Sequence, residues 1–237
     1  MKKMSLGVFL LCIMGLWPLS SNASQNMIHL NEFFGFSFNL AAEINYYQFD
    51  FSDELLTVNA HPADSPTGST KVDFDEGWGI NCRLKLRFYF DLPIPFTMQA
   101  GTDLGLNIMA VDAYRSGLFE TERCDYGGES YAYAQLLPAW YILNPTIGIT
   151  IWPVVIEMGF PYNQFTLVTG HDRWGEWDRV DTNTWTGFGQ RYYLGVDLKY
   201  FGLGLSYERY QPEFDGYETK IESWNLLFTF GGMLYPL

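Results

Sequence analysis

The sequence predicts an all-β protein, an antiparallel up-and-down transmembrane β-barrel of eight strands with short periplasmic turns and four long extracellular loops. Three observations predict it: period-two alternation of apolar and polar residues, connections that alternate in length, and negative charge concentrated in the long connections. With 237 residues, 18% of them aromatic, the chain is too rich in large apolar side chains to be disordered. Its net charge of -13 argues against nucleic acid as a partner, because phosphate binding needs a basic surface.

Residues 1–23 predict a cleaved signal peptide. Lys2 and Lys3 precede an uncharged apolar run over residues 6–19, which is shorter than the ~20 residues of a membrane-spanning helix. Ser21 and Ala23 supply the small residues that a signal peptidase prefers before its cleavage site. Residues 24–237 are expected to form a single domain, because no repeat or linker divides them.

Six segments alternate between apolar and polar residues, as half-buried strands do. In the first, Phe34 and Phe36 alternate with Gly35 and Ser37. The six segments lie near residues 34–46, 78–90, 96–108, 192–200, 203–207 and 224–234.

An uncharged stretch over residues 130–156 supplies the remaining two strands. Its three prolines exclude one long helix, and Asn144–Pro145 is typical of a turn. We therefore expect strands near residues 131–143 and 146–158. Pro138 and Pro153 lie equally far from that turn, so they are expected to pair and to leave a gap in the hydrogen bonds between the strands. Such a gap would admit a lipid laterally.

The connections between these strands alternate in length, which is the pattern of an outer-membrane barrel. Short turns are expected at residues 91–95, 144–145 and 200–202, and long loops near residues 48–75, 112–129, 159–184 and 210–220. An even number of strands also returns both termini to the same side.

The apolar face is expected to point outward, toward lipid. Glycines crowd the polar face and suit the narrow interior of an eight-stranded barrel. The alternative is a soluble lipocalin-like carrier, with the apolar face lining a pocket. Aromatic residues near the strand ends favour the membrane barrel, since they form girdles at both interfaces; they are Trp78, Trp140, Trp152, Tyr192, Tyr200 and Trp224.

With these features the chain resembles the small eight-stranded outer-membrane proteins of the OmpA membrane-domain and OmpX type. The resemblance covers about residues 33–235 and is one of pattern. It implies a bacterial outer-membrane location, contact with outer-membrane lipids and lipopolysaccharide, and a structural or surface-interaction role.

Most charged residues of the predicted strands have the polar, inward parity. We interpret them as an ion-pair network that fills the lumen, since buried charges are tolerated only when paired. The alternative is a narrow pore that conducts ions. The predicted network comprises Glu43, Arg83, Lys85, Arg87, Asp103, Arg191, Asp197, Lys199 and Glu208.

The long loops carry most of the acidic residues and are the expected site of interaction, for adhesion or for capture of an extracellular protein or cation. Trp174, Trp177 and Trp185 are interleaved with acidic residues there, and exposed tryptophan is enriched at protein contacts. No cofactor motif or metal-ligand spacing is present, so neither a cofactor nor a metal is expected.

A weaker alternative is a lipid-modifying enzyme of the outer membrane. His61, Asp64 and Ser65 in the first loop could supply a base, its orienting acid and a nucleophile. This set resembles, in kind rather than in motif, the lipid A palmitoyltransferases. His171–Asp172 is a similar hint of an omptin-like protease. We expect a non-enzymatic protein, because ordinary loop chemistry accounts for these residues.

Overall fold

The computed structural model describes residues 27–31, 34–59, 69–72, 74–91, 97–107, 114–118, 130–139, 141–173, 176–198 and 201–231. The predicted signal peptide, Trp140, Tyr200 and Cys124 lie outside these residues. Within them, no helix is long and apolar enough to cross a membrane.

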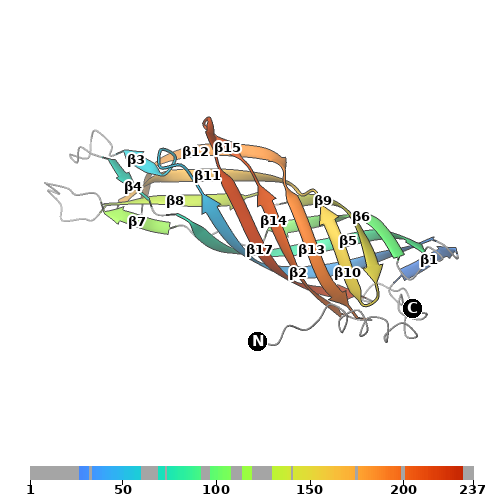
Figure 1. Cartoon of the computed structure of the whole chain (residues 1–237). Coiled ribbons are helices and arrows are strands. Elements are labelled where there is room, and N and C mark those ends of the chain that lie inside the picture. Colours follow the sequence, from blue (N-terminus) through green and yellow to red (C-terminus); the bar gives the residue numbers. More distant parts are fainter. Residues whose placement is uncertain are drawn as a thin grey trace, which may run out of the picture.

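Eight strands close into an antiparallel barrel, which confirms the predicted fold class (Figure 1). Each strand pairs with the next around the ring, and the last pairs with the first. The eight are β2 (Phe34–Asp50), β5 (Glu76–Asp91), β6 (Thr97–Asn107), β9 (Tyr141–Ile151), β10 (Val154–Gly159), β13 (Gln190–Asp197), β14 (Phe201–Tyr210) and β17 (Lys220–Gly231).

The register of the strands sets the tilt of the barrel. Following the paired residues around the ring from Phe34 returns to β2 at Ile44, ten residues further along (44 − 34). With a rise of ~3.3 Å per residue and ~4.8 Å between strands, this stagger tilts the strands by about 40° from the barrel axis. An eight-stranded barrel of this kind is just wide enough inside for side chains to fill it.

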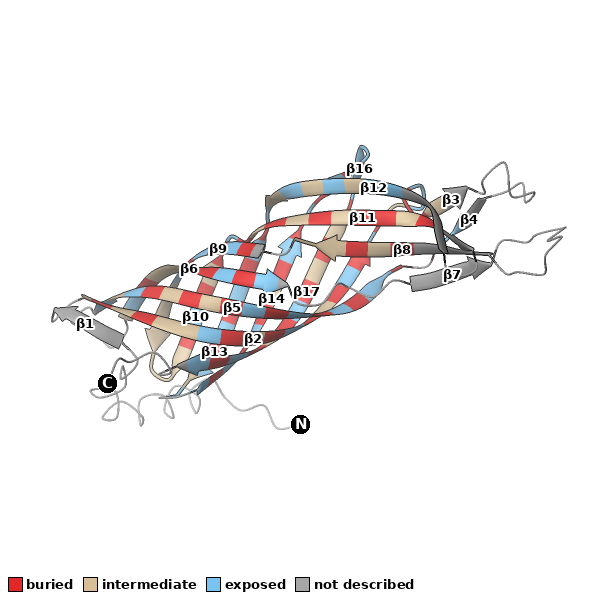
Figure 2. Ribbon diagram, turned by 180° about the vertical axis from the view of Figure 1, so that it is seen from behind, coloured by how far each residue is buried: buried red, intermediate tan, exposed pale blue. Residues whose placement is uncertain are grey.

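The apolar residues of the strands face outward and the polar residues face inward, as predicted. Leu194 and Leu205 face outward and are each 58% exposed. Tyr193, which precedes Leu194 on β13, faces inward and is 2% exposed. Figure 2 shows buried positions alternating with intermediate or exposed ones along much of the barrel wall. Cys82 lies on the outer wall, is exposed and is free.

A ladder of five aromatic residues crosses five neighbouring strands on the outer wall. The rings of Tyr46 and Trp78 lie 4.9 Å apart, as do those of Tyr207 and Trp224. In order of pairing the ladder is Tyr192, Tyr207, Trp224, Tyr46 and Trp78. The outward row on one side of it is wholly apolar: Leu194, Leu205, Leu226, Ile44 and Ile80. The row on the other side is polar: Gln190, Arg209, Glu222, Gln48 and Glu76. The ladder therefore marks a boundary between lipid and water.

The turn expected at Asn144–Pro145 is wrong, and with it the two predicted strands around it. β9 and β10 join at Trp152–Pro153, where Ile151 pairs with Val154. Asn144 is instead buried within β9, and its Nδ2 donates to Asp103 Oδ2 at 2.9 Å. A local turn preference was thus overridden by pairing with the neighbouring strand β6, where Asp103 lies opposite Asn144.

The proposed pairing of Pro138 with Pro153 is also wrong. Pro138 lies opposite Phe165, and Pro153 lies in the β9–β10 turn. The proline that does stand in the barrel wall is Pro145, opposite Thr102 of β6.

The region near residues 159–184 was predicted to be a loop, but its described residues form most of two long strands. β11 (Tyr162–Arg173) and β12 (Glu176–Phe188) continue β10 and β13 beyond the barrel, and β8 (Ser130–Pro138) leads into β9. With β7 (Tyr114–Leu118) they form an open sheet in the order β7-β8-β11-β12, which protrudes from one side of the barrel (Figure 1). Charged residues in this segment hid the alternation of Phe165 and Leu167 with Gln164 and Thr166.

Two small hairpins complete the same end of the molecule. β3 (Thr57–Asn59) pairs with β4 (Ser69–Lys71), and β15 (Glu213–Phe214) pairs with β16 (Tyr217–Glu218). The second hairpin turns through Asp215 and Gly216, both with positive φ, within the segment predicted as the last long loop. At the other end, β1 (Met27–Asn31) pairs with the start of β2.

Candidate functional site

The middle of the lumen is filled by a cluster of four paired charges from four strands. Arg83 Nη2 lies 2.7 Å from Glu208 Oε1, and Arg191 Nη1 lies 2.6 Å from the same oxygen. Arg191 Nη2 lies 2.9 Å from Glu43 Oε1, and Arg83 Nε donates to the other Glu43 oxygen. All four residues are at most 3% exposed, so each charge is stabilised by protein partners in place of water.

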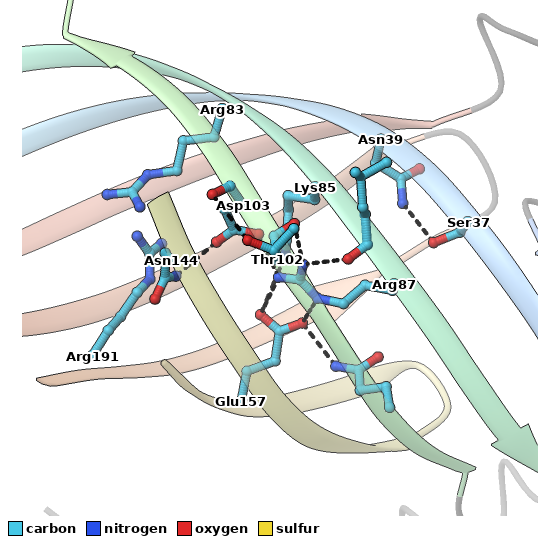
Figure 3. Close-up of polar contacts among 12 residues, drawn as sticks. Ser37, Asn39, Arg83, Lys85, Arg87, Thr102, Asp103, Asn144, Glu157 and Arg191 are labelled. Atoms are coloured by element: carbon cyan, nitrogen blue, oxygen red, sulfur yellow. Dashed lines mark hydrogen bonds and ion pairs between the residues drawn. The ribbon is translucent and has the colours of Figure 1, made fainter. Parts of the chain in front are cut away.

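A second cluster continues the charged layer along the lumen (Figure 3). Arg87 lies 2.6 Å from both Asp103 Oδ1 and Glu157 Oε1. Lys85 Nζ lies 3.7 Å from Glu157 Oε2 and 4.3 Å from the centre of the Tyr193 ring. We call the two clusters together the ionic layer; its four bases and four acids balance, and it comprises Glu43, Arg83, Lys85, Arg87, Asp103, Glu157, Arg191 and Glu208.

Glu157 is the member of the ionic layer that the sequence did not indicate. The single strand expected over residues 146–158 gives Glu157 the same parity as Ile147 and Ile149, which face outward. With the turn at residues 152–153, the inward parity of β10 passes through Val155, Glu157 and Gly159, and the residue becomes a visible partner for Lys85.

Two other residues were proposed for the network. Asp197 is at the end of β13, and its Oδ1 is buried without a hydrogen-bond partner among the described residues. Lys199 lies outside the described residues.

Close packing fills the lumen beside the charges. The ring of Tyr193 lies over Gly195 and Gly204, which face each other on β13 and β14. A Cβ atom on Gly204 would lie 2.3 Å from that ring, so a larger residue does not fit without moving it. These glycines therefore accommodate the ring, which packs in the lumen beside the Lys85 ammonium group of the ionic layer.

Beyond the ionic layer, β2 and β14 continue into an aromatic core, to which β8, β11, β15 and β17 also contribute. The rings of Phe49 and Phe74 lie 4.8 Å apart, and those of Phe165 and Tyr210 lie 4.9 Å apart. This core comprises Tyr47, Phe49, Phe51, Leu55, Leu56, Val72, Phe74, Ala134, Leu136, Phe165, Leu167, Tyr210, Phe214 and Ile221. We call the part of the molecule built around it the lobe: the ends of β2, β14 and β17 with β3, β4, β7, β8, β11, β12, β15 and β16.

A hydrogen bond joins the two regions. The Tyr210 hydroxyl belongs to the aromatic core and donates to Glu208 Oε2, in the ionic layer, at 2.8 Å. The sequence held a signal for the aromatic core that we missed. The inward parity of β2 changes from Glu43 and Asn45 to Tyr47 and Phe49.

The surface of the lobe is acidic in its described part. Exposed bases there are few, and Lys71 Nζ is held 2.7 Å from Asp53 Oδ1. The exposed acids on or next to the lobe are Asp50, Asp53, Glu54, Asp75, Glu76, Asp181, Glu213, Asp215 and Glu218. Among the described residues, no three His, Cys, Asp or Glu side chains are placed to hold a metal ion.

Most residues of the other sequence hypotheses fall outside the described residues. His61, Asp64, Ser65 and Trp174 are among them, and the side chains of His171, Asp172 and Trp177 are not described. Trp185 is described, and it packs against the aromatic core: its ring lies 6.2 Å from that of Phe165 and 6.4 Å from that of Tyr210.

No protein-family model matches the sequence, and no curated protein has significant sequence similarity to it. Among solved structures, the chain is similar to Ail, the attachment invasion locus protein of Yersinia pestis, in complex with the heparin analogue sucrose octasulfate. That match has 10% identity and a TM-score of 0.48, and covers 81% of this chain and 96% of Ail. A second Ail structure has 11% identity and a TM-score of 0.43, covering 84% of this chain and 99% of that one. Neisserial surface protein A has 9% identity and a TM-score of 0.39, with coverage of 84% and 99%.

Proposed function

We propose that this chain is exported by the signal peptide at residues 1–23, forms a barrel in a bacterial outer membrane, and binds a partner at the cell surface through its acidic lobe. One observation carries the proposal: the carboxylates are displayed by a lobe that has a buried core of its own. A surface with its own core presents charges in fixed positions, which favours selective binding over mere solvation.

The filled lumen favours binding over transport. The ionic layer occupies the barrel, and the aromatic core covers one end of it. A pathway for solutes would require both regions to open.

Charge decides which partners the lobe attracts. Acidic residues outnumber basic ones on its exposed surface, so it repels polyanions and attracts cationic protein segments. The proposed partner is therefore an extracellular protein with a basic binding segment.

Binding of a labelled Lys-rich peptide to the full-length protein in detergent micelles tests this function. We expect affinity at low salt that falls steeply as salt is added, because exposed charges are screened. Neutralising the hairpin acids in the triple variant E213Q, D215N and E218Q should weaken binding by about tenfold, as expected when several facing charges are lost.

The matched control removes charges of the opposite sign from the same rim. The variant R209Q with K220Q should bind the peptide at least as well as the wild type. Equal weakening in both variants, or no binding of the wild type at low salt, would contradict the proposed function.

Membrane location has its own test. A closed barrel satisfies its backbone hydrogen bonds internally and resists cold SDS, so the extracted protein should change gel mobility on boiling. Recovery in the soluble periplasmic fraction without such a change would refute the location.

A further inference from the structure

Three buried oxygen atoms at the end of the lumen opposite the lobe have no hydrogen-bond partner among the described residues. They are Tyr193 Oη on β13, Asp197 Oδ1 at the end of the same strand, and Thr229 Oγ1 on β17. Tyr193 is 2% exposed and Thr229 is 5% exposed, so both hydroxyl groups are shielded from bulk water. Because buried polar groups nearly always have a partner, these oxygens indicate one that is not a described side chain.

The strand register brings the three oxygens to the same stretch of wall. Asp197 lies opposite Gly202 of β14, which in turn lies opposite Thr229. A Cβ atom on Gly202 would lie 2.2 Å from Asp197 Oδ1, so the carboxylate extends over β14. One inward position deeper, a Cβ atom on Gly195 would lie 2.1 Å from Tyr193 Oη. The Tyr193 side chain therefore runs along β13 and carries its hydroxyl toward Asp197.

Asp197 adds one negative charge to a lumen whose ionic layer is already neutral. Lys85, Arg87 and Glu157 act on its carboxylate through space. Lys85 is paired with Glu157, at 3.7 Å, and Arg87 is paired with Glu157 and Asp103, each at 2.6 Å. No base among the described residues forms an ion pair with Asp197 itself. This end of the lumen therefore carries a carboxylate that needs a positive charge from elsewhere.

The chemistry of the three groups selects the kind of partner. A carboxylate and two hydroxyl groups offer only oxygen ligands, which hard cations prefer. A water molecule would satisfy the hydrogen bonds but leave the negative charge of Asp197 unbalanced. A divalent ion would leave an excess of positive charge near Lys85. A small, hard, monovalent cation meets both requirements, and sodium is such a cation.

Asp197 also connects the three oxygens to the outside of the barrel. It is the last residue of β13 and is only half-buried as a whole, although its Oδ1 atom is buried. Figure 1 shows this end of β13 on the side of the molecule that carries β1, away from the lobe. A cation can reach the carboxylate from this end, and the ionic layer blocks its further passage.

We propose that Tyr193, Asp197 and Thr229 together bind one sodium ion at the end of the lumen opposite the lobe. Asp197 supplies the negative charge, and the two hydroxyl oxygens complete the protein ligands. The bound ion neutralises this end of the lumen and links β13 to β17 across β14. The site lies far from the acidic surface of the lobe, so it is independent of the proposed function.

The dependence of stability on sodium tests the site. The full-length protein in detergent micelles is unfolded by heat while choline chloride replaces sodium chloride, so that the ionic strength and the screening stay constant. A ligand that binds only the folded state stabilises it, so raising sodium from about 1 mM to about 150 mM should raise the unfolding temperature by about 3 °C. An unchanged unfolding temperature would overturn the inference, since a proton or a water molecule would then satisfy the carboxylate.

Four variants assign the sodium effect to these residues. Asp197→Asn keeps the shape of the side chain but removes its charge, and should abolish the effect. Tyr193→Phe and Thr229→Val each remove one ligand and should weaken sodium binding by about tenfold. The matched control is Asp50→Asn, which neutralises an exposed acid of the lobe and should retain the full effect.

The gel-mobility shift on boiling verifies that each variant still forms the barrel. A full sodium effect in Asp197→Asn would overturn the inference, because the ion would then bind elsewhere. Equal loss of the effect in Asp50→Asn would also overturn it, by showing a general response to charge. If Asp197→Asn does not fold, the two hydroxyl variants decide, and wild-type sodium affinity in both would refute the site.

Discussion

The ionic layer and the aromatic core share the barrel strands β2 and β14 and have opposite chemistry. Along β2 the inward residues are Glu43 and Asn45 in one region and Tyr47 and Phe49 in the other, and between them Tyr46 faces outward in the aromatic ladder. The interior therefore changes where the exterior changes from lipid to water. Within the membrane, burying an apolar side chain in the lumen gains little free energy, because the lipid outside the barrel is equally apolar. Paired polar groups therefore fill the barrel there. On the polar side of the aromatic ladder the strands are surrounded by water, and there the hydrophobic effect stabilises an apolar interior.

The largest expected effect tests the ionic layer. Arg83→Leu leaves Glu43 and Glu208 with less compensation in a buried site, and should lower the free energy of unfolding by about 3–5 kcal/mol. Denaturant unfolding of the detergent-solubilised protein measures it. The double variant E43Q with R83L should regain part of the loss, and equal stability of wild type and Arg83→Leu would refute the role assigned to the layer.

The next effect is confined to the lobe. Phe165→Ala removes a fully buried ring from the aromatic core and should cost about 3 kcal/mol locally. Because the barrel has separate packing, hydrogen exchange should accelerate in β8 and β11 while the gel-mobility shift remains. Loss of that shift would show that the lobe and the barrel unfold together, and would contradict their separate packing.

A smaller effect concerns the bond between the regions. Tyr210→Phe keeps the ring in the core but removes the hydroxyl that donates to Glu208, and should cost about 1–2 kcal/mol. Double-mutant cycles with Glu208→Gln measure the coupling. A coupling of zero would mean that the regions are joined by packing alone.

The last prediction is that a substitution in the aromatic core leaves ion conductance unchanged. Phe74→Ala loosens the aromatic core, but the ionic layer still fills the lumen, so wild type and variant should both fail to conduct ions in planar bilayers. Channels that appear only in the variant would show that the aromatic core is the sole seal. Channels in the wild type would contradict the filled lumen itself.

The barrel could be predicted because one face of each strand contacts lipid and must be apolar. The resulting alternation of apolar and polar residues is visible in the sequences of β2 and β5. The turn at residues 152–153 could not be predicted, because Asn144 is held in a strand by Asp103, which is distant in the sequence. The protruding strands were missed for a related reason. β11 and β12 stand in water on one face, so they carry the polar residues by which loops are recognised. For the candidate surface, charge was readable from composition, whereas the lobe that displays it depends on contacts between residues that are distant in the sequence.

Arg87 has a consequence for how the molecule assembles. Its Nη1 donates to the carbonyl of Leu86 on β5, at 3.0 Å, and to the carbonyl of Thr102 on β6, at 3.2 Å, from inside the barrel. The same guanidinium is held by Asp103 and Glu157. One side chain of the lumen therefore bonds to the backbone of two neighbouring strands of the wall. Closing the cylinder and packing its contents thus belong to one cooperative step.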